Sequence, residues 1–281
     1  MSPQLVFNDP ETVAALTPDN PFDRMADGRP RVPDDLLDRL AAVTNDEAWG
    51  VLERGNDYLY QFEGNWLNLH PDQVTVGRAL TAIFVPRRPD LHAVVDEAGK
   101  GRGPAGKQNT WLIDSLVERD VLVVDLFGKV RDGTLIGDNL GTAIQARTRS
   151  GGLVVNGGIR DMMRLRQLDR IGVFAKGVDP SAIAEVTLAS VNGPVRIGRA
   201  VAMPGDAVLA TAVGVTFIPP HLVQEVVERS EETRLRDVFG KSMIAAGRYT
   251  TGQIDTAPWA DDIEAHYRQW RSEQRGPVEV S

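Results

Sequence analysis

The central part of the sequence alternates between extended and helical hydrophobic patterns, and this alternation limits the possible folds more than any other feature. Apolar runs predict buried strands at residues 76–85 (VGRALTAIFV), 121–126 (VLVVDL) and 153–156 (LVVN). Helices are predicted between them, at residues 109–120 (NTWLIDSLVERD) and 137–148 (GDNLGTAIQART). This strand-helix order is typical of parallel sheets with helical crossovers, so the sequence predicts an α/β fold.

The flanking segments predict two terminal arms around one main domain. Residues 1–32 are rich in proline and predict an irregular N-terminal arm that packs on the surface or on a neighbouring subunit. Residues 33–230 form the predicted main domain, whose second half consists of short β-rich runs separated by glycine and proline. Residues 231–281 predict a C-terminal helical extension, which we expect to pack on a partner subunit.

The composition excludes several classes of function. The chain has 281 residues, a formal net charge of −8 and no cysteine. The negative charge argues against broad nucleic-acid or membrane-surface binding, and the lack of cysteine excludes thiol nucleophiles, disulfides and cysteine-ligated zinc. The N-terminal segment lacks the basic and apolar regions of a signal peptide, and no apolar run reaches the ~18 residues of a membrane span. We therefore expect a cytoplasmic protein with neither nucleic-acid nor membrane partners.

Two other patterns give weaker indications. GRGPAGKQ (101–108) fits the G-x-x-x-x-G-K pattern of phosphate-binding loops, but Gln108 follows Lys107 where a Mg²⁺-binding hydroxyl is needed. A glycine- and lysine-rich loop is the simpler interpretation, and such a loop could still close over an anionic substrate. No G-x-S-x-G elbow is present, and no metal-ligand spacing relates the four histidines, His70, His92, His221 and His266.

The stretch LVVNGGIRD (153–161) ends a predicted strand with a fixed cation, Arg160, beside a fixed anion, Asp161. Upstream, Asp138 stands at the start of the predicted 139–148 helix, where an acid is favoured by free N–H groups and the helix dipole. One interpretation is that Asp138 caps that helix and that Arg160 and Asp161 form an exposed pair at another helix start. The alternative is that the three side chains form one site.

The second interpretation predicts chemistry on a 2-oxo acid. Gly157 and Gly158 would let the backbone approach a ligand, and Arg160 offers a planar fork for a carboxylate or keto acid. Asp138 and Asp161 offer oxygen ligands that suit Mg²⁺ or Mn²⁺, and the first amides of the helix would seat a carboxylate. Carbon–carbon cleavage beside a ketone leaves negative charge on the carbonyl oxygen, which a metal and an arginine stabilise.

The segment GDNLGTAIQARTRSGGLVVNGGIRD (137–161) resembles the RraA-like family. This family contains the regulator of ribonuclease activity A and the class II 4-hydroxy-4-methyl-2-oxoglutarate and 4-carboxy-4-hydroxy-2-oxoadipate aldolases. Flanking segments are similar to the family in the same order, namely VLVVDLFGK, IGVFAKG, PVRIGRAVAMPGD and GVTFIPPHLVQEVV. The resemblance covers roughly residues 33–230 and implies that the predicted main domain is an RraA-like aldolase domain.

The resemblance implies a compact α/β/α sandwich, akin to swivelling phosphohistidine domains, that assembles as a homotrimer or homohexamer with active sites between subunits. It implies a Mg²⁺- or Mn²⁺-dependent lyase that releases pyruvate from a small 2-oxo acid, as an aldolase or an oxaloacetate decarboxylase. Arg160 would then hold the keto acid and stabilise the enolate, Asp161 would ligate the metal, and Asp138 would hold water of the metal's shell and assist proton transfer. The pyruvate carboxylate would be bound at the helix start, by Asn139, Leu140 and Gly141.

The sequence departs from the family pattern at four points, one of which is that the arms at both ends are longer than those of typical members. The spacing from Asp138 to Arg160 is one residue longer, and ATAVGV (210–215) replaces a pattern that is usually acidic. Arg164 stands where an acid is common, so it would weaken metal binding or bind a second substrate carboxylate. Two alternatives to the lyase therefore stay open: a non-catalytic binding protein like the ribonuclease regulators, and a different lyase or hydrolase with a bulkier substrate.

Overall fold

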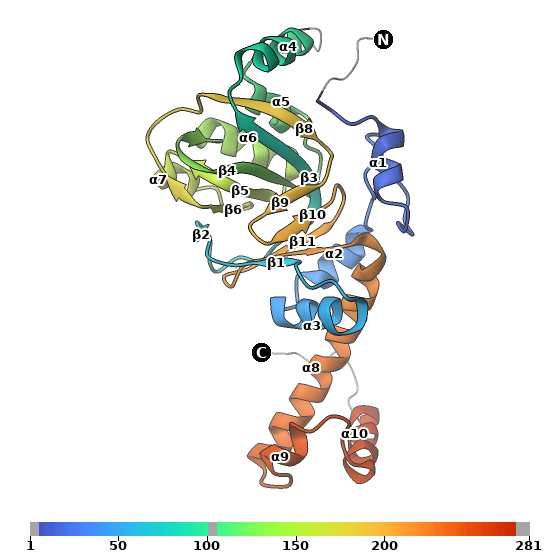
Figure 1. Ribbon diagram of the computed structural model, residues 1–281. Helices are drawn as coiled ribbons and strands as arrows, with labels where there is room; N and C mark the ends of the chain where they lie inside the picture. The colour runs from blue at the N-terminus through green and yellow to red at the C-terminus, as the bar shows by residue number, and fades with distance from the viewer. Residues whose placement is uncertain (1–5, 101–105, 274–281) are drawn as a thin grey trace.

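A mixed β-sheet runs through the centre of the molecule (Figure 1). The computed structural model describes residues 6–100 and 106–273. Strand order in the main sheet is β1-β12-β11-β3-β4-β5-β6-β2, with β7 beside β5 and β8 beside β3. The strands are β1 Phe62–Glu63, β2 Leu67–Asn68, β3 Thr75–Pro86, β4 Asp120–Thr134, β5 Gly152–Ile159, β6 Gly172–Ala175, β7 Gly177–Val178, β8 Val186–Val191, β11 Ala207–Ala210 and β12 Val215–Ile218, and a separate hairpin joins β9 Val195–Ile197 to β10 Ala200–Ala202.

Helices lie at both ends of the chain and between the central strands (Figure 1). They are α1 Pro10–Leu16, α2 Asp34–Leu40, α3 Asn45–Asn56, α4 Pro89–Lys100, α5 Gln108–Asp114, α6 Asp138–Thr148, α7 Met162–Leu165, the 3₁₀ turn η1 Pro220–Leu222, α8 Val223–Ala245, α9 Thr251–Ile254 and α10 Asp261–Glu273. Within the described ranges, none of these helices is both long and apolar enough to cross a membrane.

The centre of the sheet is parallel, as the alternating sequence predicts. Strands β3, β4, β5 and β6 pair in parallel, and α6 forms the crossover from β4 to β5. The run Val121–Val124 is fully buried, because both faces of the sheet are covered at this position. The predicted α/β class is therefore confirmed.

The two faces of the sheet are covered by different kinds of structure. Alternate residues of β3, such as Val76 and Leu80, pack under the helices on one face, with α2, α3 and α8 at one end and α4, α5 and α6 at the other. On the opposite face, Ala79 packs with Val195 and Ile197 of the β9–β10 hairpin. The third layer of the sandwich is therefore a β-hairpin where the expectation was helices.

Strand β4 leaves its regular pairing with β5 and then returns to it. The pairing shifts register after Asp125 and again after Lys129, so that Gly157 lies opposite Lys129 and Gly158 opposite Thr134. A Cβ on Gly158 would stand 2.7 Å from the carbonyl oxygen of Val130, and one on Gly157 would meet Leu126 at 2.8 Å. The two glycines thus make room for the backbone and side chains of β4, and not for a ligand as the sequence suggested.

The N-terminal arm packs on the core of its own chain. Arg29, which is 1% exposed, forms two hydrogen bonds of 2.9 and 3.0 Å with the fully buried carboxylate of Asp120, the first residue of β4. The same guanidinium donates to Asp27 at 2.7 Å. A bidentate, hydrogen-bonded pair satisfies charges that would otherwise destabilise the interior.

The C-terminal extension projects away from the sheet (Figure 1). Helix α8 begins in the core, with Val223 and Val227 buried against α2 and α3, and continues without a break through the predicted boundary at residue 230. Helices α9 and α10 pack on its far half around Phe239 and Tyr267. That domain boundary stays a prediction.

We predict that the buried ion pair is a large contributor to stability. Asp120→Asn leaves the buried guanidinium of Arg29 with the partly exposed Asp27 as its remaining carboxylate partner, so the free energy of unfolding should fall by about 2–4 kcal/mol. Glu231→Gln breaks an exposed pair with Arg39 and should change the same quantity by about 0–1 kcal/mol. Urea unfolding followed by circular dichroism measures both variants, and equal small changes would contradict the prediction.

Candidate functional site

The structure brings the start of α6 against the residues that follow β5. The amide nitrogen of Arg160 donates to the carbonyl oxygen of Ile136 at 3.0 Å, which fixes the two segments side by side. A Cβ added to Gly137 would stand 2.3 Å from Oδ2 of Asp161 and 3.0 Å from Nε of Arg160. Glycine therefore allows the close approach of Asp161 and Arg160 to the N-terminus of α6.

Asp161 adopts a backbone conformation that is uncommon for residues other than glycine. Its φ and ψ of 54° and 35° lie in the left-handed region, immediately before α7. Oδ2 of Asp161 lies 3.7 Å from Nε of Arg160, and the two side chains are 37% and 43% exposed. The turn thus holds a carboxylate and a guanidinium together, with both accessible to a ligand.

The N-terminus of α6 offers free backbone donors. Gly137 is the N-cap and has no side chain with which to cap the helix, and Oδ1 of Asp138 accepts from the amide of Asn139 at 2.9 Å. Within the described residues, the amide of Leu140 makes no hydrogen bond. The amide of Gly141 already donates to the carbonyl oxygen of Gly137 at 2.9 Å, and a Cβ on Gly141 would collide with Leu165. Gly141 therefore serves the packing of α6 on α7, and its amide is not free for a substrate.

Arg164 belongs to the same cluster. Its Nη1 donates to Oδ2 of Asp138 at 2.9 Å, while 75% of the Arg164 side chain stays exposed. This hydrogen bond is the main reason that the pKa of Asp138 is lowered, and the amide of Asn139 adds to the effect against the opposing influence of burial. The sequence placed Arg164 near the site but did not indicate that it would pair with Asp138.

The donors suit a hydrated hard cation better than a closed metal cage. Among residues 6–100 and 106–273, no group of three or more acidic or histidine side chains is placed to hold a metal. Mg²⁺ commonly binds proteins through one or two carboxylates and keeps several water molecules. Asp161 can supply a direct ligand of this kind, whereas the carboxylate of Asp138 is shared with Arg164.

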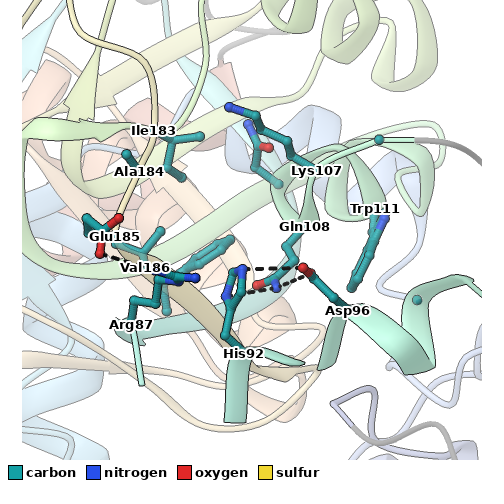
Figure 2. Close-up of a pocket in the computed structure, with 14 residues that line it drawn as sticks. Arg87, His92, Asp96, Lys107, Gln108, Trp111, Ile183, Ala184, Glu185 and Val186 are labelled. Atoms are coloured by element: carbon teal, nitrogen blue, oxygen red, sulfur yellow. Dashed lines mark hydrogen bonds and ion pairs between the residues drawn. The ribbon is translucent and has the colours of Figure 1, made fainter. Parts of the chain in front are cut away.

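A cavity of about 730 Å³ lies beside α4, α5 and the segment before β8 (Figure 2). Figure 2 shows Gln108 between His92 and Asp96, and Nε2 of Gln108 donates to Oδ1 of Asp96 at 2.7 Å. Oε1 of Gln108 accepts from the amide of Leu188 at 2.6 Å. The side chain of Gln108 is thus buried and hydrogen-bonded to both α4 and β8. Residues 101–105, which make up most of the predicted phosphate loop, lie outside the described residues.

His92 and Asp96 both line this cavity and form a contact that was not predicted from the sequence. His92 contacts Asp96 at 3.3 Å and Thr187 at 2.9 Å, so its ring is held between α4 and β8. Nδ2 of Asn109 donates to the carbonyl oxygen of Leu135 at 2.8 Å, so the wall of the cavity is bonded to the segment that leads to Gly137. The i,i+4 spacing of His92 and Asp96 is the sequence signal that could have found this pair.

Comparisons with known proteins point to one family. The model of the RraA-like family, described as Aldolase/RraA, matches residues 50–217. Protein DlpA of Legionella pneumophila is 30% identical over 189 residues, which are 66% of this chain and 28% of DlpA. A Halalkalibacterium halodurans protein named "Putative 4-hydroxy-4-methyl-2-oxoglutarate aldolase" is 29% identical over 86 residues, which are 31% of this chain and 40% of that protein. The chain thus spans less than half the length of each of these curated relatives.

Solved structures agree with this match. Streptomyces coelicolor RraAS2, an unusual member of the RNase ES inhibitor RraA protein family, superimposes with a TM-score of 0.63 and 25% identity, covering 75% of this chain and 99% of that one. An uncharacterized protein from Pseudomonas syringae pv. tomato gives a TM-score of 0.66 at 20% identity, covering 83% of this chain and 96% of that one, and this likeness shows the fold alone.

We predict that Arg164 controls the ionisation of Asp138. Because Arg164 favours the charged carboxylate, Arg164→Met should raise the pKa of Asp138 towards its ordinary value. Stability from this pair is present above the ordinary pKa of an aspartate and is lost as the pH falls through the lowered pKa. Carboxyl ¹³C NMR between pH 2 and 6 measures the shift. Arg147→Met, which removes a partner of Asp114 instead, should leave Asp138 unchanged. An Asp138 titration that Arg164→Met does not move would contradict the prediction.

Proposed function

The chain belongs to the RraA-like family, and on that premise we propose that it is a divalent-metal-dependent lyase that cleaves a carbon–carbon bond of a 2-oxo acid. The reaction would be that of a 4-hydroxy-2-oxo acid aldolase, an oxaloacetate decarboxylase, or both, since each passes through the enolate of pyruvate. One observation carries the proposal: Arg160 and Asp161 lie against Gly137, at the start of α6.

The N-terminus of α6 would bind the carboxylate of the substrate. The amide of Leu140 is available, and the amide of Asn139 is engaged only by the carboxylate of Asp138 beside it. Backbone donors at a helix start, together with the helix dipole, favour an anion at this position. A 2-oxo acid bound there would direct its keto oxygen towards the Arg160–Asp161 turn.

Arg160 would stabilise the charge that develops during bond cleavage. When the bond between C3 and C4 of the 2-oxo acid breaks, C4 leaves as carbon dioxide or, with loss of the 4-hydroxyl proton, as the carbonyl carbon of a second product. The electron pair of the broken bond is delocalised through C3 onto the keto oxygen at C2 and forms an enolate. The guanidinium of Arg160 is always charged and can donate more than one hydrogen bond, and its backbone is held by Ile136. The electrostatic stabilisation therefore needs no large movement of the chain.

Asp161 would hold the divalent metal, and Asp138 would contribute through water. A metal bound there would supply Lewis-acid polarisation of the keto oxygen. Arg164 competes for the carboxylate of Asp138, so we expect weaker metal binding than in relatives with an acid at that position. The exposed guanidinium of Arg164 could instead pair with the second carboxylate of a dicarboxylic 2-oxo acid.

A non-catalytic role is the second candidate, and the pairing of Arg164 with Asp138 favours it because this pairing neutralises one of the two acids of the site. RraAS2, to which the chain is similar, is a member of an RNase inhibitor family. A protein of this kind would act through a surface and would turn over no 2-oxo acid.

We further propose a homo-oligomer, a trimer or a hexamer, for either role.

The enzyme proposal predicts pyruvate release. Purified protein with Mg²⁺ or Mn²⁺ should convert oxaloacetate or 4-hydroxy-4-methyl-2-oxoglutarate to pyruvate, detected with lactate dehydrogenase and NADH. EDTA should abolish the activity, and a protein-free sample with the same metal corrects for spontaneous decarboxylation. No pyruvate above this blank from either substrate, with the protein folded, would favour the binding role instead.

Substitutions in the turn should separate chemistry from stability. Asp161→Asn and Arg160→Met should each lower kcat/KM by about 10²-fold or more, because each removes charge that acts on the reacting oxygen. Gly137→Ala should also lower kcat/KM, because its Cβ displaces both side chains. Gly50→Ala is the matched control, since a Cβ at Gly50 would meet nothing within 4 Å. Full activity of Asp161→Asn would contradict the site assignment.

A further inference from the structure

We propose that a small cavity between the N-terminal arm and the core binds a small organic cation of the primary ammonium class. The cavity has a volume of about 220 Å³, and none of its described lining residues belongs to the Arg160–Asp161 turn. Four segments meet around it: the arm after α1, the loop before β1, the turn between β10 and β11, and the start of the 3₁₀ turn η1. The proposal does not depend on the lyase assignment.

The carboxyl group of Asp206 forms the polar end of the cavity. Asp206 is 1% exposed and lines the cavity. Its Oδ2 accepts from the amide of Met203 at 2.8 Å, and its own amide donates to the carbonyl oxygen of Met203 at 3.1 Å. Oδ1 has no hydrogen-bond partner among the residues that the structure describes. One carboxyl oxygen of a buried residue is therefore left to a ligand or to water.

The charge balance of the cavity favours a cation. Asp19 and Asp206 both line it, whereas its described lining contains no lysine or arginine. Burial raises the pKa of Asp206 to about 7, and only the Met203 amide opposes this effect. A buried carboxylate without a counter-charge is unfavourable, so a cation that enters the cavity would gain the full attraction of this group.

Further polar groups converge on the same space. Oη of Tyr58 lies 3.5 Å from Nε2 of His221. The pKa of Tyr58 is raised by burial first and then by the charges of Asp19 and Asp206, which line the same cavity. An ammonium group has three N–H donors, which suits a carboxylate oxygen, a phenol oxygen and a ring nitrogen as acceptors.

The rest of the wall is apolar and suits a short alkyl chain. Leu16 and Pro18 come from the arm, and Pro219 and Pro220 from the opposite side. The volume corresponds to on the order of seven water molecules at ~30 Å³ each. A primary alkylammonium of four or five carbon atoms has this size, with one charged end and one apolar end.

Titration with n-butylammonium tests the proposal. Isothermal titration calorimetry at pH 8 should show saturable binding to one site, whereas the neutral analogue n-butanol and the anion butyrate should bind at least tenfold more weakly. Asp206→Asn should weaken butylammonium binding at least tenfold, because the amide oxygen can still accept from Met203 but carries no charge. Asp255→Asn, an exposed acid on the C-terminal extension, is the control and should bind as the wild type does.

The pH dependence identifies the responsible group. The titratable groups that face the cavity are Asp19, Tyr58, Asp206 and His221. Binding should strengthen from pH 6 to pH 8 as Asp206 loses its proton, and this dependence should persist in His221→Gln. Should Asp206→Asn fail to fold, Val201→Lys offers a second variant, since it adds a cation at the exposed rim and should also weaken binding at least tenfold. Absence of saturable binding to the wild type, or equal binding of butylammonium and butanol, would overturn the proposal.

Discussion

The geometry of the candidate site depends on one constraint: β4 must return to β5 after it leaves the sheet. The two strands pair regularly from Val121 to Asp125, separate, and meet again where Thr134 lies opposite Gly158. Immediately after this second meeting, Ile136 accepts a hydrogen bond from Arg160. The close approach at Gly157, Gly158 and Gly137 is possible because none of them has a side chain. A larger residue at any of the three would separate the acid and the arginine from the start of α6.

Charge within the site is nearly balanced, and this balance bears on the substrate. Asp138 and Asp161 are offset by Arg160 and Arg164, so the cluster has no large net charge before a ligand binds. Under the proposed function, a metal ion would add positive charge, and a 2-oxo acid with two carboxylates would restore the balance. A monocarboxylic substrate would leave Arg164 without a second anion beyond Asp138. The arrangement thus favours dicarboxylic 2-oxo acids, which is the class of both substrates named for the proposed reaction.

Local sequence patterns predict the core strands and explain why the start of α6 and Arg160 are neighbours, whereas the functional roles of these residues stay a prediction. Parallel strands end at the same edge of a sheet, so Arg160 after one strand and Asp138 after its neighbour could be expected to lie close together. The fully buried runs of valine and leucine in β4 and β5 made those strands recognisable. These features depend on residues near one another in the chain or on general rules of α/β folds.

Contacts between distant segments could not be predicted in the same way. Nothing in the sequence near Arg29 indicates that it pairs with Asp120, 91 residues away. The role of Gly157 and Gly158 depends on the path of β4 and not on their own neighbours, and the pairing of Arg164 with Asp138 depends on the orientation of the short helix α7. The cavity at Asp206 likewise requires the arm to fold back on its own core.

A crystal structure with Mg²⁺ and oxalate, a planar dianion that resembles the enolate of pyruvate, tests the site most directly. We predict that one oxalate carboxylate lies on the amides of Asn139 and Leu140, that the other faces Arg160, and that Asp161 is the residue that would hold the metal. Oxalate bound elsewhere, or a metal without contact to Asp161 at saturating concentration, would contradict the assignment of this turn as the catalytic centre.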